Sequence, residues 1–474
     1  MRLKIPPFVV IVLLLISDSA RATSVLPRSL DQRCAEADAV CVGTVQSSFC
    51  FRGAEGGIHT QTEIRVDEAL KGTFPATVYV VHRGGILAGV GELNGNRPIL
   101  WHGEERLFFL KLRADGTAFV NDGPAGAILL DSGALRNLFL VQIRALYPDA
   151  QSHGSDLTNT GAAAPRRQSL SVVGLLPTDG TPYRYTHGDR GEAIGYLVDM
   201  DDRPSGISTN VALTAVSNAF QAWADASSLT FRYLGLQSFG MAAIDVAQQD
   251  GVIRVQLHDL HNHINSSSTL GQGGSGFTFS TGDASVGGDG GAVNGEKFHL
   301  STRGYITMEH SQATLSDPVA LEEVLTHEIG HVLGMDHTST ADSIMQPTIH
   351  NDGRGAQLVE YDRSTIQQAY PTDNTPPFGF DRTMTTVSYP SGSNPTAGGI
   401  NQVQAFGLDR QTTNLTATLL STSTPIGSFS LNGTTLTFDA VQNFGDGEAS
   451  EGIFFALATL ILSDGTNDSP FFDV

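Results

Sequence analysis

The stretch His327-Glu328-Ile329-Gly330-His331-Val332-Leu333-Gly334-Met335-Asp336-His337 decides the fold of the centre of this 474-residue chain. Its pattern is HExxHxxGxxH. Residues four apart lie on the same face of an α-helix, about one turn from each other, so His327 and His331 point side by side. Glu328 follows the first histidine, which places its carboxylate beside a shared ion without making it a ligand. The stretch therefore predicts a helix that carries two metal-binding imidazoles and one acid–base group.

The third histidine of the pattern requires this helix to end. Gly334 stands at the position of the turn, and glycine adopts φ > 0 at little cost and commonly terminates helices. The chain can then turn back, so that His337 completes a set of three ligands. Three protein ligands leave a fourth position for water, which is typical of catalytic rather than structural zinc sites. Glu328 would take the proton of a zinc-activated water as general base and pass it to a leaving amine.

The residues before the pattern agree with a helix. Asp317 and Pro318 are typical of an N-cap and a first helical position, and the apolar residues between 324 and 333 recur at helical spacing. Two simpler interpretations remain open. The histidines could be incidental residues of a buried amphipathic helix, or the zinc site could be purely structural, in which case Glu328 would have no role.

With a methionine turn after the third histidine, the sequence resembles a metzincin metalloprotease, and within that group a matrixin. The candidate for the turn is Met345 in Ser343-Ile344-Met345-Gln346-Pro347. Thr338 after the third histidine and the eight-residue step to Met345 also fit matrixins. Pro347 stands where related families carry a tyrosine ligand. The resemblance implies one catalytic zinc ion and hydrolysis of peptide bonds in proteins or peptides.

The resemblance extends over residues 175–371. Residues 209–226 predict a helix and residues 252–257 a buried strand, and residues 360–370 look like the closing helix of the family, stopped by Pro371. The resemblance implies a central α+β zincin-like catalytic domain with a twisted mixed sheet, an active-site helix beneath it and a cleft across the front. Two stretches compete for the strand that binds substrate, Gly273–Ser280 and Tyr305–Ser311.

The loop before the active-site helix departs from the family. Matrixins often hold a structural zinc and calcium ions there, but the family's spacing for the structural zinc is absent. The stretch still carries metal-binding side chains, so structural Ca²⁺ or a second zinc stays open beside an ordinary solvated loop. The side chains are those of His258, Asp259, His261, His263, Asp283, Asp289 and His299.

The N-terminus predicts export. Arg2 and Lys4 precede an apolar run too short to span a membrane, and Ala20-Arg21-Ala22 is a small-x-small cleavage site. We therefore expect a secreted, extracellular protein, or a periplasmic one in a Gram-negative host, without a membrane anchor. The formal charge is 28 − 49 = −21, which argues against nucleic acid or an anionic membrane as partner.

Composition divides the chain into a signal peptide and three domains around one linker. The N-terminal unit carries strand-like runs between glycine-rich turns, which indicate a small β-barrel with a faint resemblance to netrin-type OB barrels. If that resemblance holds, this domain could inhibit the enzyme intramolecularly. The C-terminal unit predicts a β-sandwich-like accessory domain. The expected boundaries are 1–22 (signal peptide), 23–150 (N-terminal domain), 151–172 (linker), 173–372 (catalytic domain) and 373–474 (accessory domain).

Cys34, Cys41 and Cys50 all lie in the N-terminal unit. In an exported protein, one pair is expected to form a local disulfide and to leave one free thiol. That thiol could in principle occupy the open zinc position, although the latency motif of vertebrate matrixins is absent.

The sequence therefore predicts a secreted zinc metalloendopeptidase with Glu328 as general base. Two alternatives remain. One is a catalytically inactive secreted binding or adhesion protein with a metalloprotease-like domain, and the other is a zinc hydrolase of non-peptide substrates. Replacing Glu328 by alanine separates a protease from a binding protein.

Overall fold

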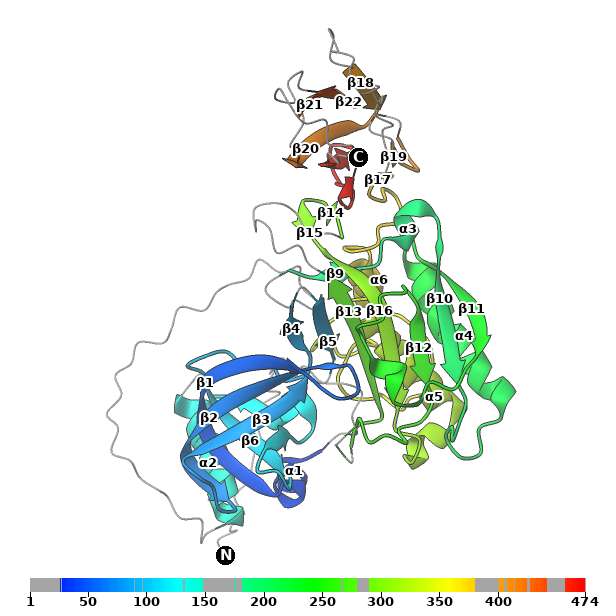
Figure 1. Ribbon diagram of the computed structural model, residues 1–474. Coiled ribbons are helices and arrows are strands. Elements are labelled where there is room, and N and C mark those ends of the chain that lie inside the picture. Colours follow the sequence, from blue (N-terminus) through cyan, green and yellow to red (C-terminus); the bar gives the residue numbers. More distant parts are fainter. Residues whose placement is uncertain are drawn as a thin grey trace, which may run out of the picture.

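The computed structural model shows three bodies arranged along the chain (Figure 1). The signal peptide and the linker of the sequence prediction lie outside the described residues. The structure describes residues 26, 28–88, 90–95, 97–130, 133–147, 175, 181–264, 266, 268–278, 290–379, 400–404, 407–412, 414–423, 427–440 and 457–473.

The N-terminal body is a closed barrel of five strands flanked by two helices. Its strands follow the order β1-β2-β3-β7-β6, and β1 also pairs with β6, which closes the ring; β3 and β7 run parallel and the other pairs antiparallel. β8 pairs antiparallel with β6 and lies outside this ring. Apolar side chains of the inner face fill the barrel. The elements are α1 (Leu30–Glu36), β1 (Ala39–Arg52), β2 (Ile58–Lys71), β3 (Thr77–Arg83), β6 (Glu105–Leu112), β7 (Ala118–Val120), η1 (Gly123–Gly126), β8 (Ala127–Leu129) and α2 (Gly133–Leu146).

The expected disulfide is wrong, because all three cysteines are free. Cys41 is buried among the barrel's core residues, and Cys34 is buried under the helices on the opposite face. Cys50 lies on β1 beside the hydroxyl of Thr60, 3.4 Å away. Burial raises the pKa of the Cys34 thiol to about 11, so this thiol stays protonated at neutral pH.

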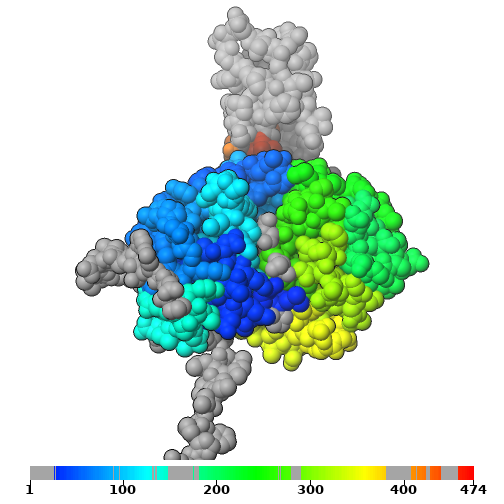
Figure 2. All heavy atoms as spheres, turned by 90° about the horizontal axis from the view of Figure 1, so that it is seen from below, coloured from blue at the N-terminus to red at the C-terminus, as the bar shows by residue number. Residues whose placement is uncertain are grey.

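The boundary expected for the N-terminal domain does not hold for one hairpin. Strands β4 (Gly85–Leu87) and β5 (Val90–Asn94) leave the barrel after β3 and join the central sheet. Figure 1 shows both strands at the edge of that sheet, and Figure 2 shows the blue and cyan N-terminal body packed directly against the green and yellow central body. Pairing of β5 with a distant strand is decided by tertiary contacts that no local pattern encodes.

The central body is a mixed sheet with helices on one face. The sheet order is β11-β10-β12-β16-β13-β5-β4, and β9 pairs in parallel with the first two residues of β16. β10, β11, β12 and β16 run parallel, whereas β13 is antiparallel to β16. The strands are β9 (Tyr183–Arg184), β10 (Ala193–Asp199), β11 (Thr230–Leu236), β12 (Ile253–Gln256), β13 (Gly271–Thr278), β14 (Ala292–Val293), β15 (Glu296–Lys297) and β16 (His299–Met308).

Two long helices cover this sheet and share one core. α4 (Thr209–Ala226) has the range expected from its apolar spacing, and Ser208 caps its start. It packs against α5 (Pro318–Val332), and the indole of Trp223 donates to the carbonyl oxygen of Thr326 at 2.8 Å. The hydrogen bond fixes the two helices to each other in a fully buried position. The remaining helices are short: α3 (His187–Arg190), η2 (Gly240–Ile244), η3 (Ala313–Ser316) and α6 (Glu360–Ile366).

The closing helix is shorter than expected. α6 ends at Ile366 and the chain continues in tight turns to Tyr370, instead of remaining helical up to Pro371. The buried guanidinium of Arg184 donates to the carbonyl oxygen of Ala369, and Tyr370 donates to the carbonyl oxygen of Leu333. These long-range partners hold the last turn against the catalytic core, which the local sequence could not indicate.

The C-terminal body consists of strands in separate small sheets. One sheet has the order β18-β22-β21 and another β20-β23-β24; their apolar faces share one cluster that includes Leu436 and Leu460. The second of these sheets includes the strand 457–463, and residues 441–456 before it lie outside the described residues. The strands are β17 (Phe378–Gly379), β18 (Ile400–Gln404), β19 (Gly407–Leu408), β20 (Thr416–Ser423), β21 (Gly427–Asn432), β22 (Thr435–Ala440), β23 (Leu457–Ser463) and β24 (Phe472–Asp473).

Among the described residues, no helix combines the length and the apolar composition needed to cross a bilayer.

Candidate metal centre

α5 carries the first part of the site. Asp317 caps the helix by accepting from the backbone N–H of Val319 at 3.0 Å, and Pro318 occupies the first turn. From Val324 to Val332 every residue of the helix is buried. A polar residue on such a helix needs a partner or an ion, since burying it unpaired is costly.

The helix ends where the sequence predicted. Its last helical residue is Val332, and Gly334 takes φ +101°, a conformation that L side chains rarely adopt. A Cβ at this position would also lie 2.7 Å from the carbonyl oxygen of Tyr183. The N–H of Met335 closes the turn on the carbonyl oxygen of Gly330 at 2.9 Å. The chain therefore turns back toward the helix, and His337 arrives from a different direction.

The structure brings His327, His331 and His337 together. Their Nε2 atoms lie 3.0 Å (327 to 331), 2.9 Å (327 to 337) and 2.9 Å (331 to 337) apart. The three rings are at most 9 % exposed. In the part of the chain that the structure describes, this is the sole group of three potential ligands that converges.

The outer nitrogens of two rings fix their tautomers. Nδ1 of His327 lies 2.7 Å from the carbonyl oxygen of Ile344, and Nδ1 of His331 lies 2.9 Å from that of Met335. A carbonyl oxygen only accepts, so each Nδ1 carries the proton and each Nε2 presents a lone pair. Converging lone pairs repel one another unless a cation lies between them. Zinc fits this donor set, because Zn–N bonds of about 2.0–2.1 Å bring neighbouring nitrogens to separations of this order.

Burial also keeps these imidazoles neutral. It lowers the pKa of His331 to about 4 and that of His327 well below its usual range, and the adjacent imidazole lowers the latter further. Neutral imidazole is the form that binds a metal ion. At neutral pH both rings are therefore ready to act as ligands without losing a proton.

Glu328 lies beside the triad and faces β13. Its side chain is fully buried, and a Cβ built on Gly271 of β13 would lie 3.0 Å from its Cγ. Only small residues at this point of β13 allow the strand to run so close to the helix. The side chain of Glu328 therefore lies next to the strand that borders the three histidines.

Met345 lies beneath the three histidines. It is fully buried, and its Sδ is the nearest atom to a Cβ built on Gly330, on the helix that bears the ligands. The carbonyl oxygen of Met345 accepts from the N–H of Thr338 at 3.1 Å, next to the third histidine. The methionine turn and the triad are thus parts of one packed unit.

The sequence did not point to Asp362, which holds this turn. Its carboxylate accepts from the N–H of Ile344 at 3.1 Å and from the hydroxyl of Ser343, and it also caps α6 through the N–H of Val359 at 3.0 Å. Ile344 in turn orients the ring of His327 through its carbonyl oxygen. Asp362 stands three residues into a helix, where an acidic residue often caps, and this was the available signal.

The loop side chains that could have formed a second metal site make contacts within the protein instead. Asp259 accepts from the N–H groups of His263 and Ile264, at 2.7 and 2.8 Å, and so closes a turn. His258 lies 3.4 Å from Asp199, and His299 stacks on Phe277. Within the described residues, no three of the loop's histidine and aspartate side chains converge as a metal site would require. Asp283 and Asp289 lie outside the described residues. Structural calcium stays a prediction.

β13 rather than β16 borders the metal centre. β16 lies between β12 and β13 inside the sheet, whereas β13 runs beside Glu328. Of the two stretches that competed for the substrate-binding strand, the geometry favours the one that begins at residue 273, and the strand itself spans Gly271–Thr278.

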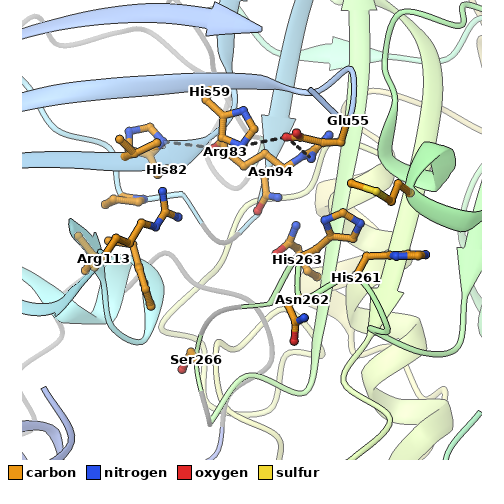
Figure 3. A pocket seen from close by; sticks show the side chains of 16 residues that line it. Glu55, His59, His82, Arg83, Asn94, Arg113, His261, Asn262, His263 and Ser266 are labelled. Atoms are coloured by element: carbon orange, nitrogen blue, oxygen red, sulfur yellow. Dashed lines mark hydrogen bonds and ion pairs between the residues drawn. The ribbon is translucent and has the colours of Figure 1, made fainter. Parts of the chain in front are cut away.

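A second polar feature lies where the barrel meets the catalytic body. A cavity of about 440 Å³ is lined by His59, His82 and Arg113 of the barrel and by His261 and His263 of the catalytic loop (Figure 3). Burial, and then the charges of Arg97 and Arg83, lower the pKa of His82 to about 4 and that of His263 to about 3. Both imidazoles are therefore neutral in the folded protein at neutral pH.

These lowered pKa values predict acid sensitivity of the interface. Unfolded histidine titrates near 6.5, so the unfolded chain binds protons first as the pH falls, and the folded state loses stability from about pH 6.5 down to pH 4 and below. If about 1 kcal/mol survives solvent screening, the midpoint of thermal unfolding falls by about 2–4 °C. Unfolding curves at pH 7 and 4.5 measure this. A double variant, His82→Gln with His263→Gln, should show a shallower dependence, and an unchanged slope would contradict the assignment.

Three converging imidazoles, a buried carboxylate and a methionine turn packed against the same helix are the features of a metzincin-type zinc metalloprotease domain. Comparison with known proteins agrees. The matrixin family model matches residues 190–371. The chain is 40 % identical over 77 residues to metalloendoproteinase 2-MMP of Arabidopsis thaliana, and the aligned segment covers 16 % of this chain and 20 % of the relative. It is 45 % identical over 65 residues to matrix metalloproteinase-21 of Cynops pyrrhogaster, and this segment covers 14 % of this chain and 11 % of the relative.

Residues 190–371 therefore form a matrixin domain. The aligned segments span a fifth or less of the length of these relatives, so the likeness does not extend to the whole proteins. A matrixin domain supports zinc metalloprotease activity and protein substrates.

Proposed function

We propose that this protein is a secreted zinc metalloendopeptidase in which His327, His331 and His337 hold the catalytic ion and Glu328 is the general base. The observation that carries the proposal is the convergence of three imidazole Nε2 atoms within 3.0 Å of one another next to a buried carboxylate. A structural zinc site would leave the carboxylate without a role, and here it lies on the side of the triad that faces a sheet strand.

The chain's own groups perform the remaining work. A bound zinc ion would supply an acidified water and a polarised substrate carbonyl. The N–H groups at Nδ1 of His327 and His331 donate to backbone carbonyl oxygens, which hold the rings in their binding orientation. The carboxylate of Glu328 accepts a proton and delivers it to the leaving nitrogen of the peptide. The buried surroundings strengthen these electrostatic interactions.

β13 would bind the peptide. It runs alongside Glu328, and an extended peptide could add through main-chain hydrogen bonds to the edge of β13 on which β5 lies. Recognition through the backbone suits a protease that cuts many protein sequences.

Export and the roles of the flanking domains belong to this proposal as well. The signal sequence supports secretion, and the contact between barrel and catalytic body supports regulation within the chain. An inactive binding protein would not need an intact set of three ligands and an adjacent carboxylate.

Casein cleavage with and without a zinc chelator tests the proposal. We expect cleavage to fall by about 100-fold or more when the ion is removed and to return when zinc is added back, because the ion supplies most of the stabilisation of the reaction's charge. Cleavage that continues at the same rate in the chelated, metal-free protein would contradict it.

A further inference from the structure

The edge of β13 beside the metal centre is covered by a strand of the N-terminal region. β5 pairs with β13 in antiparallel register from Val90 opposite Thr278 to Asn94 opposite Gly274. Beyond the strand, the N–H of Gly95 donates to the carbonyl oxygen of Gly273 at 2.9 Å. Without β4 and β5, β13 would be the outermost strand of the sheet. An extended peptide that adds to β13 therefore needs the position that β5 holds.

Gly95 brings this segment directly over the metal centre. A Cβ built on Gly95 would lie 3.0 Å from Nε2 of His331 and 2.7 Å from its Cδ2, and the second distance is shorter than real Cβ contacts. Only glycine fits between the strand and the imidazole. The backbone of residue 95 thus fills space next to the proposed ligand atom, where the bond to be cut would have to lie.

Leu93 anchors the strand on the same face as Gly95, since residues two apart in a strand point to one side. It is 1 % exposed and packs with Tyr183 and Phe277 in a small apolar cluster. Burial of a leucine side chain stabilises its contact through the hydrophobic effect, so this pocket holds the strand in one register.

The opposite face of β5 is held by a buried polar network. The carboxylate of Glu92 is fully buried; it forms an ion pair with Arg83 and accepts from the hydroxyl of Tyr305 at 2.9 Å. Nδ2 of Asn94 donates to the same hydroxyl at 3.1 Å. Because Tyr305 belongs to β16 and Arg83 to the barrel, the network ties β5 to both bodies. Loss of Arg83 would leave the buried carboxylate of Glu92 without its ion-pair partner.

A separate contact keeps the barrel in place around the strand. The carboxylate of Asp122, at the start of η1, accepts from the hydroxyl of Ser266 at 2.9 Å and from that of Ser268, both just ahead of β13. A strand held within the same chain has a high effective concentration at its site, so a separate peptide competes with it poorly.

We propose that residues 90–95 are a built-in pseudosubstrate strand that closes the metal centre to protein substrates until the strand leaves β13. The proposal rests on the proposed function, since it concerns regulation of that same site. Hydrolysis by the closed protein then depends on rare opening of the β5–β13 pair.

The test compares the full-length, zinc-loaded protein with Leu93→Asp, which places a charge in the apolar cluster with Tyr183 and Phe277. We expect casein hydrolysis to rise by about tenfold or more and amide hydrogen exchange in residues 271–278 to accelerate, because burying an unpaired carboxylate there is unfavourable. Arg83→Met is the second variant; it acts from the other face of the strand and should shift both readouts in the same direction.

Leu112→Asp is the matched control, since it makes the same chemical change on an exposed position of the same body. It should leave both readouts at the wild-type values. Wild-type exchange provides a test that needs no variant: β13 should be protected like an interior strand, and exchange as fast as that of an uncovered edge would overturn the proposal. Faster exchange in Leu93→Asp and Arg83→Met without faster hydrolysis, in a protein that cleaves casein, would overturn it too.

Failure of the proposed function gives a different result. In that case none of the proteins cleaves casein, although zinc is bound and exchange shows that β13 has been released.

Discussion

Replacing Glu328 by alanine is expected to lower casein hydrolysis by about 10²–10⁴-fold, the range of general acid–base catalysis, and to leave zinc content unchanged. The reason is geometric. Glu328 adjoins the first histidine on α5 and faces β13, but it is outside the converging group of three ligands. Loss of its carboxylate removes the proton acceptor without removing a metal ligand.

The measurement combines casein cleavage with zinc content by atomic spectroscopy, in the full-length protein and in the Leu93→Asp background. Glu322→Ala is the control, because Glu322 lies on the same helix and only accepts from Asn218 and the N–H of Ala356. Equal hydrolysis by Glu328→Ala and the wild-type protein would refute Glu328 as the base. Loss of zinc from Glu328→Ala would instead make it a ligand.

Replacing His337 by alanine is expected to remove most of the bound zinc and, with it, hydrolysis. The remaining pair on α5 offers two nitrogens where a zinc site of this kind uses three protein ligands. Zinc bound only to the folded state stabilises it by mass action, so the wild-type unfolding temperature should rise with zinc concentration while that of the variant stays almost constant.

Zinc titration followed by thermal unfolding measures this difference. His350→Ala is the control. It removes an imidazole that lies near the site but is not one of the three proposed ligands; this ring hydrogen-bonds Glu323 and the carbonyl oxygen of Ala341. A His337→Ala protein that keeps stoichiometric zinc and full hydrolysis would mean that the third ligand is another group.

The site was readable from the sequence because its parts are close together in the chain. His327, Glu328 and His331 share one helix, and their mutual geometry follows from its repeat. Gly334 and His337 follow within a single turn. Met345 needed knowledge of the family, and Asp362 was missed because its partners, Ser343 and Ile344, lie on a separate loop.

The flanking parts were predicted less well, for a related reason. Runs of alternating residues indicated strands in the N-terminal body, and the structure has strands there. The expected disulfide was wrong because cysteine number does not report distance. The hairpin β4–β5 was assigned to the barrel, since nothing in its own residues shows that it pairs with a strand about 180 positions later in the chain.

The sequence by itself determined the chemistry: the residue types and their spacing specify three imidazoles, an adjacent carboxylate and the turn that joins them. Only the tertiary structure decided access to that chemistry. Whether β13 is a free edge depends on β5 and Arg83 of the N-terminal region meeting Tyr305, more than 200 residues later in the chain. Local periodicity encodes which face of an element is buried, whereas the partner that buries it is selected by packing of the whole chain.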